Sequence, residues 1–233
     1  MATSSVEQAP ILVVAALGRE LAKLNSEALS GVALLETGEG VANAERSLEA
    51  WLEQKTARAV LSIGFAGALS QSLRAGDLVI ARKVRDAVAD PDVALLAAAA
   101  RVKTNLPAVQ FGSAVTCREI LWQAESKRCL ASTFEPHEIG FVDMESTAIA
   151  SVCGRRGLPF LILRSITDLL DEDLPLNFNL YRDADGRVDS KRILKAAMLK
   201  PRALAGLLEL RKRSELCAAR MAEFVRSLVP LIS

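Results

Sequence analysis

The sequence has 233 residues, of which 51% are hydrophobic and 4% are aromatic, and its formal net charge is +1. This near-neutral charge gives no electrostatic case for binding nucleic acid. The length and the apolar content are enough for one well-packed core, so we expect a single domain over residues 1–233, with C-terminal helices over residues 188–233. A core of aliphatic side chains suits parallel strands that are covered by helices on both faces.

The four cysteines are widely spaced, without a C-x-x-C pair, and the chain has a single histidine, His137. This pattern predicts neither a zinc site nor a disulfide framework, so we expect reduced thiols in a cytoplasmic protein that needs no metal ion or other cofactor. The segment Met1–Pro10 contains Glu7 and no basic residue, unlike a secretory signal. No apolar run reaches the ~18 residues of a membrane-spanning helix.

Apolar runs bounded by glycine or polar residues alternate with amphipathic stretches along the chain. The predicted strands are Ile11–Ala16, Val32–Glu36, Ala59–Ile63, Leu78–Ala81, Gln110–Val115, Phe141–Met144 and Phe160–Leu163. The predicted helices begin near Arg19 and then cover Ala42–Gln54, Pro91–Arg101, Trp122–Ser132, Glu145–Arg156 and most of Ser190–Leu228, with a break near Pro201. This alternation predicts an α/β fold with a mixed, mainly parallel central sheet flanked by helices.

Two turns of small residues follow predicted strands. Thr37-Gly38-Glu39-Gly40 opens a helix, and its glycines let backbone N–H groups approach a sugar or an anion closely. It lacks the third glycine and the later acidic residue of a dinucleotide fingerprint, so we do not expect a Rossmann dehydrogenase. A tight strand–helix turn without a ligand explains these glycines equally well. Gly64-Phe65-Ala66-Gly67 is a second such loop, and two loops together predict the floor of a pocket.

Three carboxylates also follow predicted strands: Glu20, Glu145 and Asp168. Because parallel sheets bind ligands at the carboxyl ends of their strands, together they predict an acid–base site at one edge of the sheet. Taken singly, each is more often a helix-terminal charge or a cap than a catalytic group. Arg164, four residues before Asp168, is either an ion-pair partner or a clamp on a ligand.

Five segments together form a specific pattern. They are Ala16–Glu20 (A-L-G-R-E), Thr37–Gly40 (T-G-E-G), Ser62–Leu69 with Ala75–Val79 (S-I-G-F-A-G-A-L and A-G-D-L-V), Val142–Ala150 (V-D-M-E-S-T-A-I-A) and Pro159–Asp168 (P-F-L-I-L-R-S-I-T-D). In this order they resemble the motifs of methylthioadenosine/S-adenosylhomocysteine nucleosidases and related purine nucleoside phosphorylases. The resemblance implies the nucleoside phosphorylase/nucleosidase type of α/β fold and a homodimer or larger assembly. The V-D-M-E-S spelling and the C-terminal residues resemble a branch associated with hopanoid lipid synthesis.

The resemblance also implies an activity, which is cleavage of the N-glycosidic bond of a purine nucleoside. Asp168 matches the acid that protonates the purine N7, and its being Asp rather than Asn favours adenine. Glu20 matches the carboxylate that activates the attacking water in the hydrolytic members. Glu145 matches the group that grips the ribose hydroxyls, and Met144 packs against the sugar. The other substrate-binding residues implied are Asp143, Ala66, Gly67, Arg164, Gly38, Gly40 and Ile120.

The sequence departs from the family pattern at several points. Phe65 stands where many relatives have Ser or Thr near the nucleophile. The phenylalanine that stacks on the base in the nucleosidases has only Ile120 as its nearest match. The interval between the first helix and Val32 is also short. These departures predict a 5′ substituent other than methylthio.

Three functions are compatible with these residues. Glu20 favours water as the nucleophile, and we therefore expect hydrolysis. Phosphorolysis is the alternative, with phosphate as a second substrate, because no residue excludes phosphate from the turn Gly38–Gly40. The third is a nucleoside-binding protein without activity, but binding alone requires neither a proton donor nor a base for water.

The C-terminal part of the chain is basic, with eleven Lys or Arg against four Asp or Glu over residues 187–226. Leucines at 204, 207, 208, 210 and 216 accompany cations at 202, 211, 212, 213 and 220. A packing helix with a solvated basic face is the simpler interpretation. A basic amphipathic helix also binds weakly to anionic membrane surfaces. In that case the substrate carries a bulky apolar 5′ group, and Leu169–Arg187, with Phe178 and Tyr181, forms an open apolar mouth.

Overall fold

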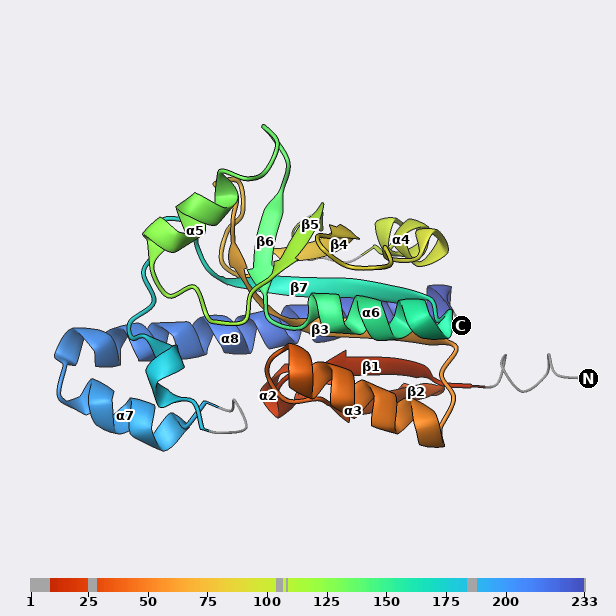
Figure 1. Ribbon diagram of the computed structural model, residues 1–233, viewed down its shortest axis with the longest axis horizontal. Helices are drawn as coiled ribbons and strands as arrows, with labels where there is room; N and C mark the ends of the chain where they lie inside the picture. Colours follow the sequence, from red (N-terminus) through yellow and green to blue (C-terminus); the bar gives the residue numbers. More distant parts are fainter. Residues whose placement is uncertain (1–8, 25–28, 104–106, 108, 184–187, 233) are drawn as a thin grey trace, which may run out of the picture.

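The computed structural model describes residues 9–24, 29–103, 107, 109–183 and 188–232. Its strands are β1 (Ile11–Ala15), β2 (Val32–Glu36), β3 (Ala59–Ala68), β4 (Leu78–Val84), β5 (Gln110–Thr116), β6 (Gly140–Asp143) and β7 (Phe160–Asp168). Its helices are α2 (Gly18–Leu21), α3 (Val41–Gln54), α4 (Val93–Ala100), α5 (Ala124–Ala131), α6 (Ser146–Arg156), α7 (Ser190–Met198) and α8 (Pro201–Leu228), with 3₁₀ turns η2 (Phe178–Tyr181) and η3 (Val229–Leu231). Figure 1 shows their arrangement.

The sheet is organised around β3, which pairs with three other strands. It runs parallel to β1 and β7 and antiparallel to β6. Since β7 also pairs with β4, and β4 continues through β5 to β6, five of these strands close into a ring, and β1 and β2 extend from it. Between the described strands, five pairings are parallel and two antiparallel, which confirms the predicted mixed, mainly parallel sheet. The closure of the ring was not predicted.

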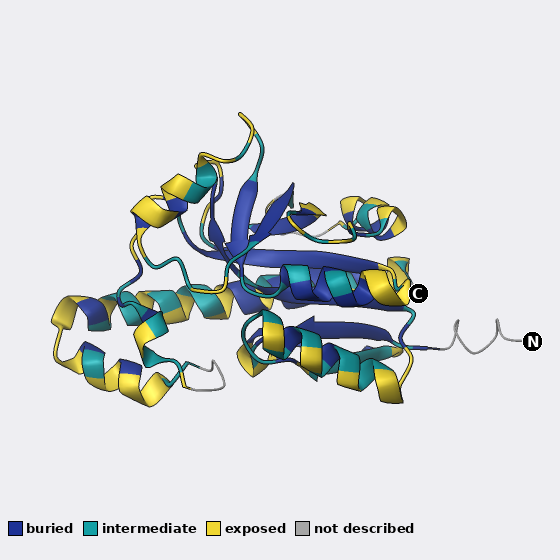
Figure 2. Ribbon diagram, in the orientation of Figure 1, coloured by how far each residue is buried: buried dark blue, intermediate teal, exposed yellow. Residues whose placement is uncertain are grey.

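Helices cover both faces of the sheet, as the alternation of side chains along β1 requires. Ile11 and Val13 pack in one apolar cluster with residues of α4 and α8, whereas Leu12 and Val14 pack in another with residues of α3 and α6. Apart from β2, which is only partly buried, the strands are therefore buried along most of their length, as Figure 2 shows in dark blue. No described helix is long and apolar enough to span a bilayer.

Two strands are longer than predicted. The sequence predicted that a strand ends at Ile63 and is followed by a loop, but β3 continues through Gly64–Gly67 to Ala68. This prediction was wrong because β7, which also continues, pairs with β3 as far as Asp168 opposite Gly67, across an irregularity in register. The other predicted strands and helices are confirmed to within a few residues at their ends, although the first helix is a single turn.

The C-terminal helices divide into a packed part and a projecting part. The end of α8, from Cys217 to Leu228, is buried mainly against β7 and its neighbours. Its beginning leaves the body of the molecule together with α7 (Figure 1). There, α7, η2 and the first turns of α8 enclose a separate apolar cluster that includes Phe178 and Ile193. We call residues 188–210 the C-terminal projection.

Candidate active site

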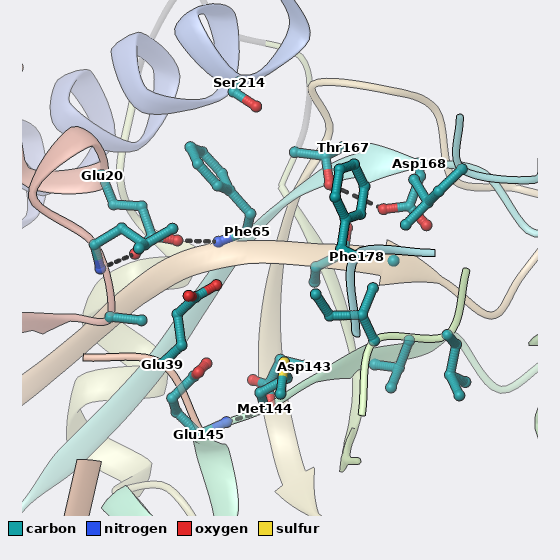
Figure 3. Close-up of a pocket in the computed structure, with 18 of the residues that line it drawn as sticks. Glu20, Glu39, Phe65, Asp143, Met144, Glu145, Thr167, Asp168, Phe178 and Ser214 are labelled. Carbon is teal, nitrogen blue, oxygen red and sulfur yellow. Dashed lines mark hydrogen bonds between the residues drawn. The ribbon is translucent and has the colours of Figure 1, made fainter. Parts of the chain in front are cut away.

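A pocket of about 180 Å³ lies at the carboxyl ends of β1, β3, β6 and β7. Glu20, Glu145 and Asp168 all line it, so the structure brings together the three carboxylates that the sequence singled out. Figure 3 shows Glu20 and Glu145 on one side with Glu39, and Asp168 on the other. Within the described residues, His, Cys, Asp and Glu side chains form no cluster suited to a metal ion.

Glu20 is held in place by backbone groups of two elements. It is the third residue of α2, and its Oε2 accepts a hydrogen bond of 2.8 Å from the N–H of Leu17, which precedes the helix. Its Oε1 accepts one of 2.9 Å from the N–H of Phe65 in β3. Burial raises the pKa of Glu20 above its ordinary value, although these two amides and Arg164 oppose the increase. The orientation of this carboxyl group therefore depends on α2 and β3 together.

Glu145 precedes α6 and contacts the glycine turn between β2 and α3. Its Oε1 accepts a hydrogen bond of 2.8 Å from the N–H of Gly40, whose φ of 89° favours glycine. Burial, followed by the charge of Asp143, raises the pKa of Glu145 to about 8, against the opposing charge of Arg164. At neutral pH this carboxyl group is therefore mostly protonated in the free protein.

The glycine turn contributes to the pocket differently from the prediction. Gly38 does not line the pocket, because it packs against Asn43 of α3, and Gly40 acts through Glu145. The expectation that both glycines contact the substrate directly is corrected accordingly. The side chain of Glu39 lines the pocket instead, and its Oε2 accepts a hydrogen bond of 3.1 Å from the N–H of Val188, at the start of the C-terminal projection. The sequence carried no signal for this role.

Asp168 ends β7, and both of its carboxyl oxygens have a partner. Oδ1 accepts a hydrogen bond of 3.0 Å from the hydroxyl of Thr167, and Oδ2 lies 2.9 Å from the ammonium of Lys127 in α5. Burial raises the pKa of Asp168, while the charge of Lys127 opposes the increase. Lys127 is itself fully buried, and the sequence carries no signal for this contact, because a lysine on a short polar helix is usually solvated.

Two glycines of β3 leave room for two of these carboxyl groups. A Cβ atom at Gly64 would lie 3.2 Å from Oε1 of Glu20, and one at Gly67 would lie 3.0 Å from Oδ2 of Asp168 and 3.2 Å from Val142. All three distances are shorter than ordinary van der Waals contacts. The small residues of this segment therefore let a strand run directly beneath the carboxyl groups.

Arg164 lies below the pocket and does not line it. Its Nε lies 2.8 Å from Oδ2 of Asp143, and its other nitrogens donate to the carbonyl and hydroxyl of Ser62, the carbonyl of Leu163 and the hydroxyl of Ser146. The expectation that Arg164 contacts the substrate is corrected: it is the ion-pair partner of Asp143. Asp143 lines the pocket, but Arg164 and Ser146 occupy its carboxylate.

The remaining expected residues, Ala66, Gly67, Met144 and Ile120, line the pocket. The N–H and C=O of Ile120 are each 2.9 Å from the side-chain amide of Asn179, which ties this segment to η2. Phe178 of η2 also lines the pocket (Figure 3). Phe178 and Phe65 are the aromatic residues of the lining, and they provide apolar surface for a flat ligand.

A second, larger cavity continues from this pocket towards α7 and α8. Its volume is about 780 Å³, and it shares Glu39, Phe65 and Phe178 with the first pocket. Its other walls include apolar side chains of the C-terminal helices and three cations at its edges. The apolar residues are Ile193, Leu194, Leu207 and Leu210, and the cations are Arg19, Lys23 and Arg211.

The closed mixed sheet and the pocket at its strand ends define a known class of α/β protein. The Phosphorylase superfamily model matches residues 27–199, and the chain belongs to this family. It is similar to the 5′-methylthioadenosine/S-adenosylhomocysteine nucleosidase of Shewanella halifaxensis, with 26% identity over 174 residues that cover 66% of this chain and 76% of that protein.

Two solved structures share the fold. The futalosine hydrolase of Helicobacter pylori superimposes with a TM-score of 0.72 at 18% identity, over 96% of this chain and 98% of that one. The 5′-methylthioadenosine/S-adenosylhomocysteine nucleosidase of Neisseria meningitidis, in complex with methylthio-immucillin-A, has a TM-score of 0.71 at 20% identity, over 94% and 98%. These likenesses confirm the predicted fold class.

Replacement of Arg164 by Met should destabilise the protein by about 3–5 kcal/mol, because it leaves Asp143 as a buried carboxylate without its counterion. Urea unfolding measures this change. Arg128→Ala, which removes the exposed pair with Asp171, is the control and should cost less than about 1 kcal/mol. Equal losses for the two variants would contradict a structural role for Arg164.

Glu145→Gln should make the stability of the protein less dependent on pH. Because the pKa of Glu145 is about 8 in the folded chain and ordinarily 4.5, the folded state binds more protons than the unfolded state between these values. The free energy of unfolding therefore falls as pH rises from about 4.5 to 8, by up to ~1.4 kcal/mol per pH unit for this group. Urea unfolding from pH 5 to 9 should give a shallower slope for Glu145→Gln than for wild type or Glu215→Gln. An unchanged slope would contradict the raised pKa.

Proposed function

We propose that this protein cleaves the N-glycosidic bond of an adenine nucleoside, with water as the nucleophile. The observation that carries the proposal is the convergence of Glu20, Glu145 and Asp168 in one pocket at the carboxyl ends of the strands. The nucleosidases among its relatives support the same reaction class. The assembly that the resemblance implies, a homodimer or larger, is part of the proposal.

Asp168 is the general acid in this mechanism. Loss of the purine leaves a sugar with oxocarbenium character and a basic leaving group, so a proton delivered to N7 eases departure. An acid in this position must keep its proton near neutral pH, and burial of Asp168 acts in that direction. Phe178, Phe65 and Ile120 supply apolar surface on which the base lies.

Glu145 and Glu20 act on the opposite side of the pocket from Asp168 (Figure 3). Glu145 binds the ribose hydroxyls and, once ionised, stabilises the positive charge that develops on the sugar, while Met144 packs against the ring. Glu20 orients the attacking water and accepts its proton. Its two backbone hydrogen bonds fix the direction in which it does so.

The charges of the pocket favour water over phosphate. Glu20, Glu39, Glu145 and Asp168 contribute acidic groups to the lining, and Arg19 is the one cation among the described lining residues. A dianion in this pocket would lack the cluster of cations that offsets its charge, because Arg19 alone provides one among the described lining residues. Phosphorolysis is the alternative reaction.

The test is to incubate the protein with adenine nucleosides, with and without phosphate, and to follow free adenine by mass spectrometry. We expect adenine release in phosphate-free buffer, near loss of that release in Glu20→Gln, and turnover lower by about two to four orders of magnitude in Asp168→Asn. Asp171→Asn, an exposed change close by in the chain, is the control and should keep wild-type turnover.

Strict dependence on phosphate, with ribose 1-phosphate as the product, would replace hydrolysis by phosphorolysis. Near-normal turnover of a folded Asp168→Asn variant would exclude Asp168 as the acid. Tight nucleoside binding without release of the base under either condition would indicate a binding protein. The first and third results therefore each select an alternative function, whereas the second concerns only the role of Asp168.

We further propose that the substrate carries a bulky apolar 5′ group and that the protein takes it from a membrane surface. The cavity of about 780 Å³ continues from the pocket and is far larger than a methylthio group requires. It lies beside the C-terminal projection, where Leu194, Met198 and Leu199 are exposed by 52%, 69% and 82%. Cations lie close to these side chains in the sequence, on α7 and at the start of α8, namely Lys191, Arg192, Lys195, Lys200 and Arg202. Exposed apolar groups among cations suit an anionic bilayer.

The protein should co-sediment with vesicles that contain anionic lipid and should be released as salt rises, because ions screen the attraction. Met198→Glu with Leu199→Glu should abolish this binding. Val88→Glu, a similar change at another exposed side chain, should not. Absence of binding at low salt, together with fast turnover of methylthioadenosine, would leave a nucleosidase without a membrane role.

A further inference from the structure

A fully buried lysine contacts the proposed acid from outside the motifs that carry the family resemblance. Lys127 lies in α5, and its ammonium donates to Oδ2 of Asp168 at 2.9 Å and to the backbone carbonyl of Leu169 at 2.5 Å. Its exposed fraction is 0%. Lysine is almost never buried without a partner, because a desolvated ammonium is costly. One partner is the last residue of β7 and the other follows it directly.

The packing of α5 explains how the lysine reaches this place. The N–H of Ala124, at the start of α5, donates to the carboxylate of Asp173 at 2.7 Å, and Arg128 pairs with Asp171 at 3.0 Å. The carbonyl of Trp122 accepts a hydrogen bond from the N–H of Leu174. The helix is thus tied to the segment that follows Asp168, and Lys127 lies within it, between the residues that make these contacts.

We propose that Lys127 is a positioning residue for Asp168: its ammonium holds the carboxyl group in the orientation and protonation state from which it donates to the leaving purine. This inference rests on the proposed function. Burial alone would leave Asp168 a weak acid that keeps its proton too tightly. General acids work best when their pKa is near the working pH, and a positive charge at 2.9 Å moves Asp168 towards that range.

The other charged side chains near Asp168, Glu172 and Arg213, pair with each other, so their charges offset one another. Glu172, just beyond β7, raises the pKa of Asp168, but it pairs with Arg213 of α8 at 2.7 Å. Arg213 also donates to the carbonyl of Thr167. On the side of β3, Gly67 brings no charge to the carboxyl group. Lys127 is therefore the charge on which the state of Asp168 chiefly depends.

The first test compares the pH profiles of wild type and Lys127→Met. Activity requires protonated Asp168, so it falls as pH rises through the pKa of this group. Removal of the ammonium raises that pKa, and the alkaline fall in kcat/KM should move to higher pH by about one to three pH units. Turnover below the fall should drop by about tenfold or more, because a weaker acid donates less readily. A uniform loss at every pH would mean that Lys127 is only structural.

The second test is a double-mutant cycle in turnover. If Lys127 acts through Asp168, adding Lys127→Met to Asp168→Asn should cause no further loss, whereas independent effects would multiply. Glu125→Gln, on the same helix with an exposed side chain, is the matched control and should leave the pH profile unchanged. Additive losses in the double variant would overturn the proposal.

A third measurement does not depend on activity. Carboxyl ¹³C NMR titration, with the Asp168 signal identified by its absence in Asp168→Asn, should give a higher pKa for Asp168 in Lys127→Met than in wild type. The same value in both proteins would overturn the proposal even if the enzyme is active. If wild type cleaves no nucleoside and the titration still shifts, the proposed function fails while the coupling of the two residues stands.

Discussion

The buried guanidinium of Arg164 is the interaction on which the arrangement of the site depends. It extends from β7 to Ser62 of β3 and to Asp143 at the end of β6, so three strands of the closed ring meet at one charge. Such a charge is tolerated in a core only with a counterion and with its other donors bonded, and Asp143 and two serine hydroxyls meet that need. Its field also lowers the pKa values of Glu20 and Glu145, against the effect of burial.

The three carboxyl groups of the pocket differ because their partners differ. Glu20 accepts two backbone N–H bonds, Glu145 accepts one and lies close to the charge of Asp143, and Asp168 faces an ammonium. Burial raises the pKa of all three, and these partners decide how far. Groups of one chemical type can therefore take separate roles as acid, base and sugar ligand within a small volume.

The pocket that holds the carboxyl groups and the larger cavity beside it depend mainly on different elements. The carboxyl groups depend on the ring of strands and on α2, α5 and α6, whereas the larger cavity lies against α7 and α8. The projection has its own apolar cluster, and Phe178 belongs to both that cluster and the pocket. Changes in α7 can therefore alter the space beside the pocket while the contacts of the three carboxyl groups stay the same.

The positions of most strands and helices, and the meeting of Glu20, Glu145 and Asp168, could be predicted from the sequence, because apolar periodicity marks the strands and parallel strands end at one edge. The closed ring could not be predicted, since it depends on pairing between β3 and β7. The same pairing makes Gly64–Gly67 part of a strand, whereas its small residues alone predict a loop. The partner of a buried charge also could not be predicted, because it lies far away in the sequence. Lys127 and Asp168 are 41 residues apart, and nothing local distinguishes this lysine from a solvated one. The local sequence pattern thus determined which segments are buried in the core, whereas only the packing of distant segments decided which buried charges pair with each other.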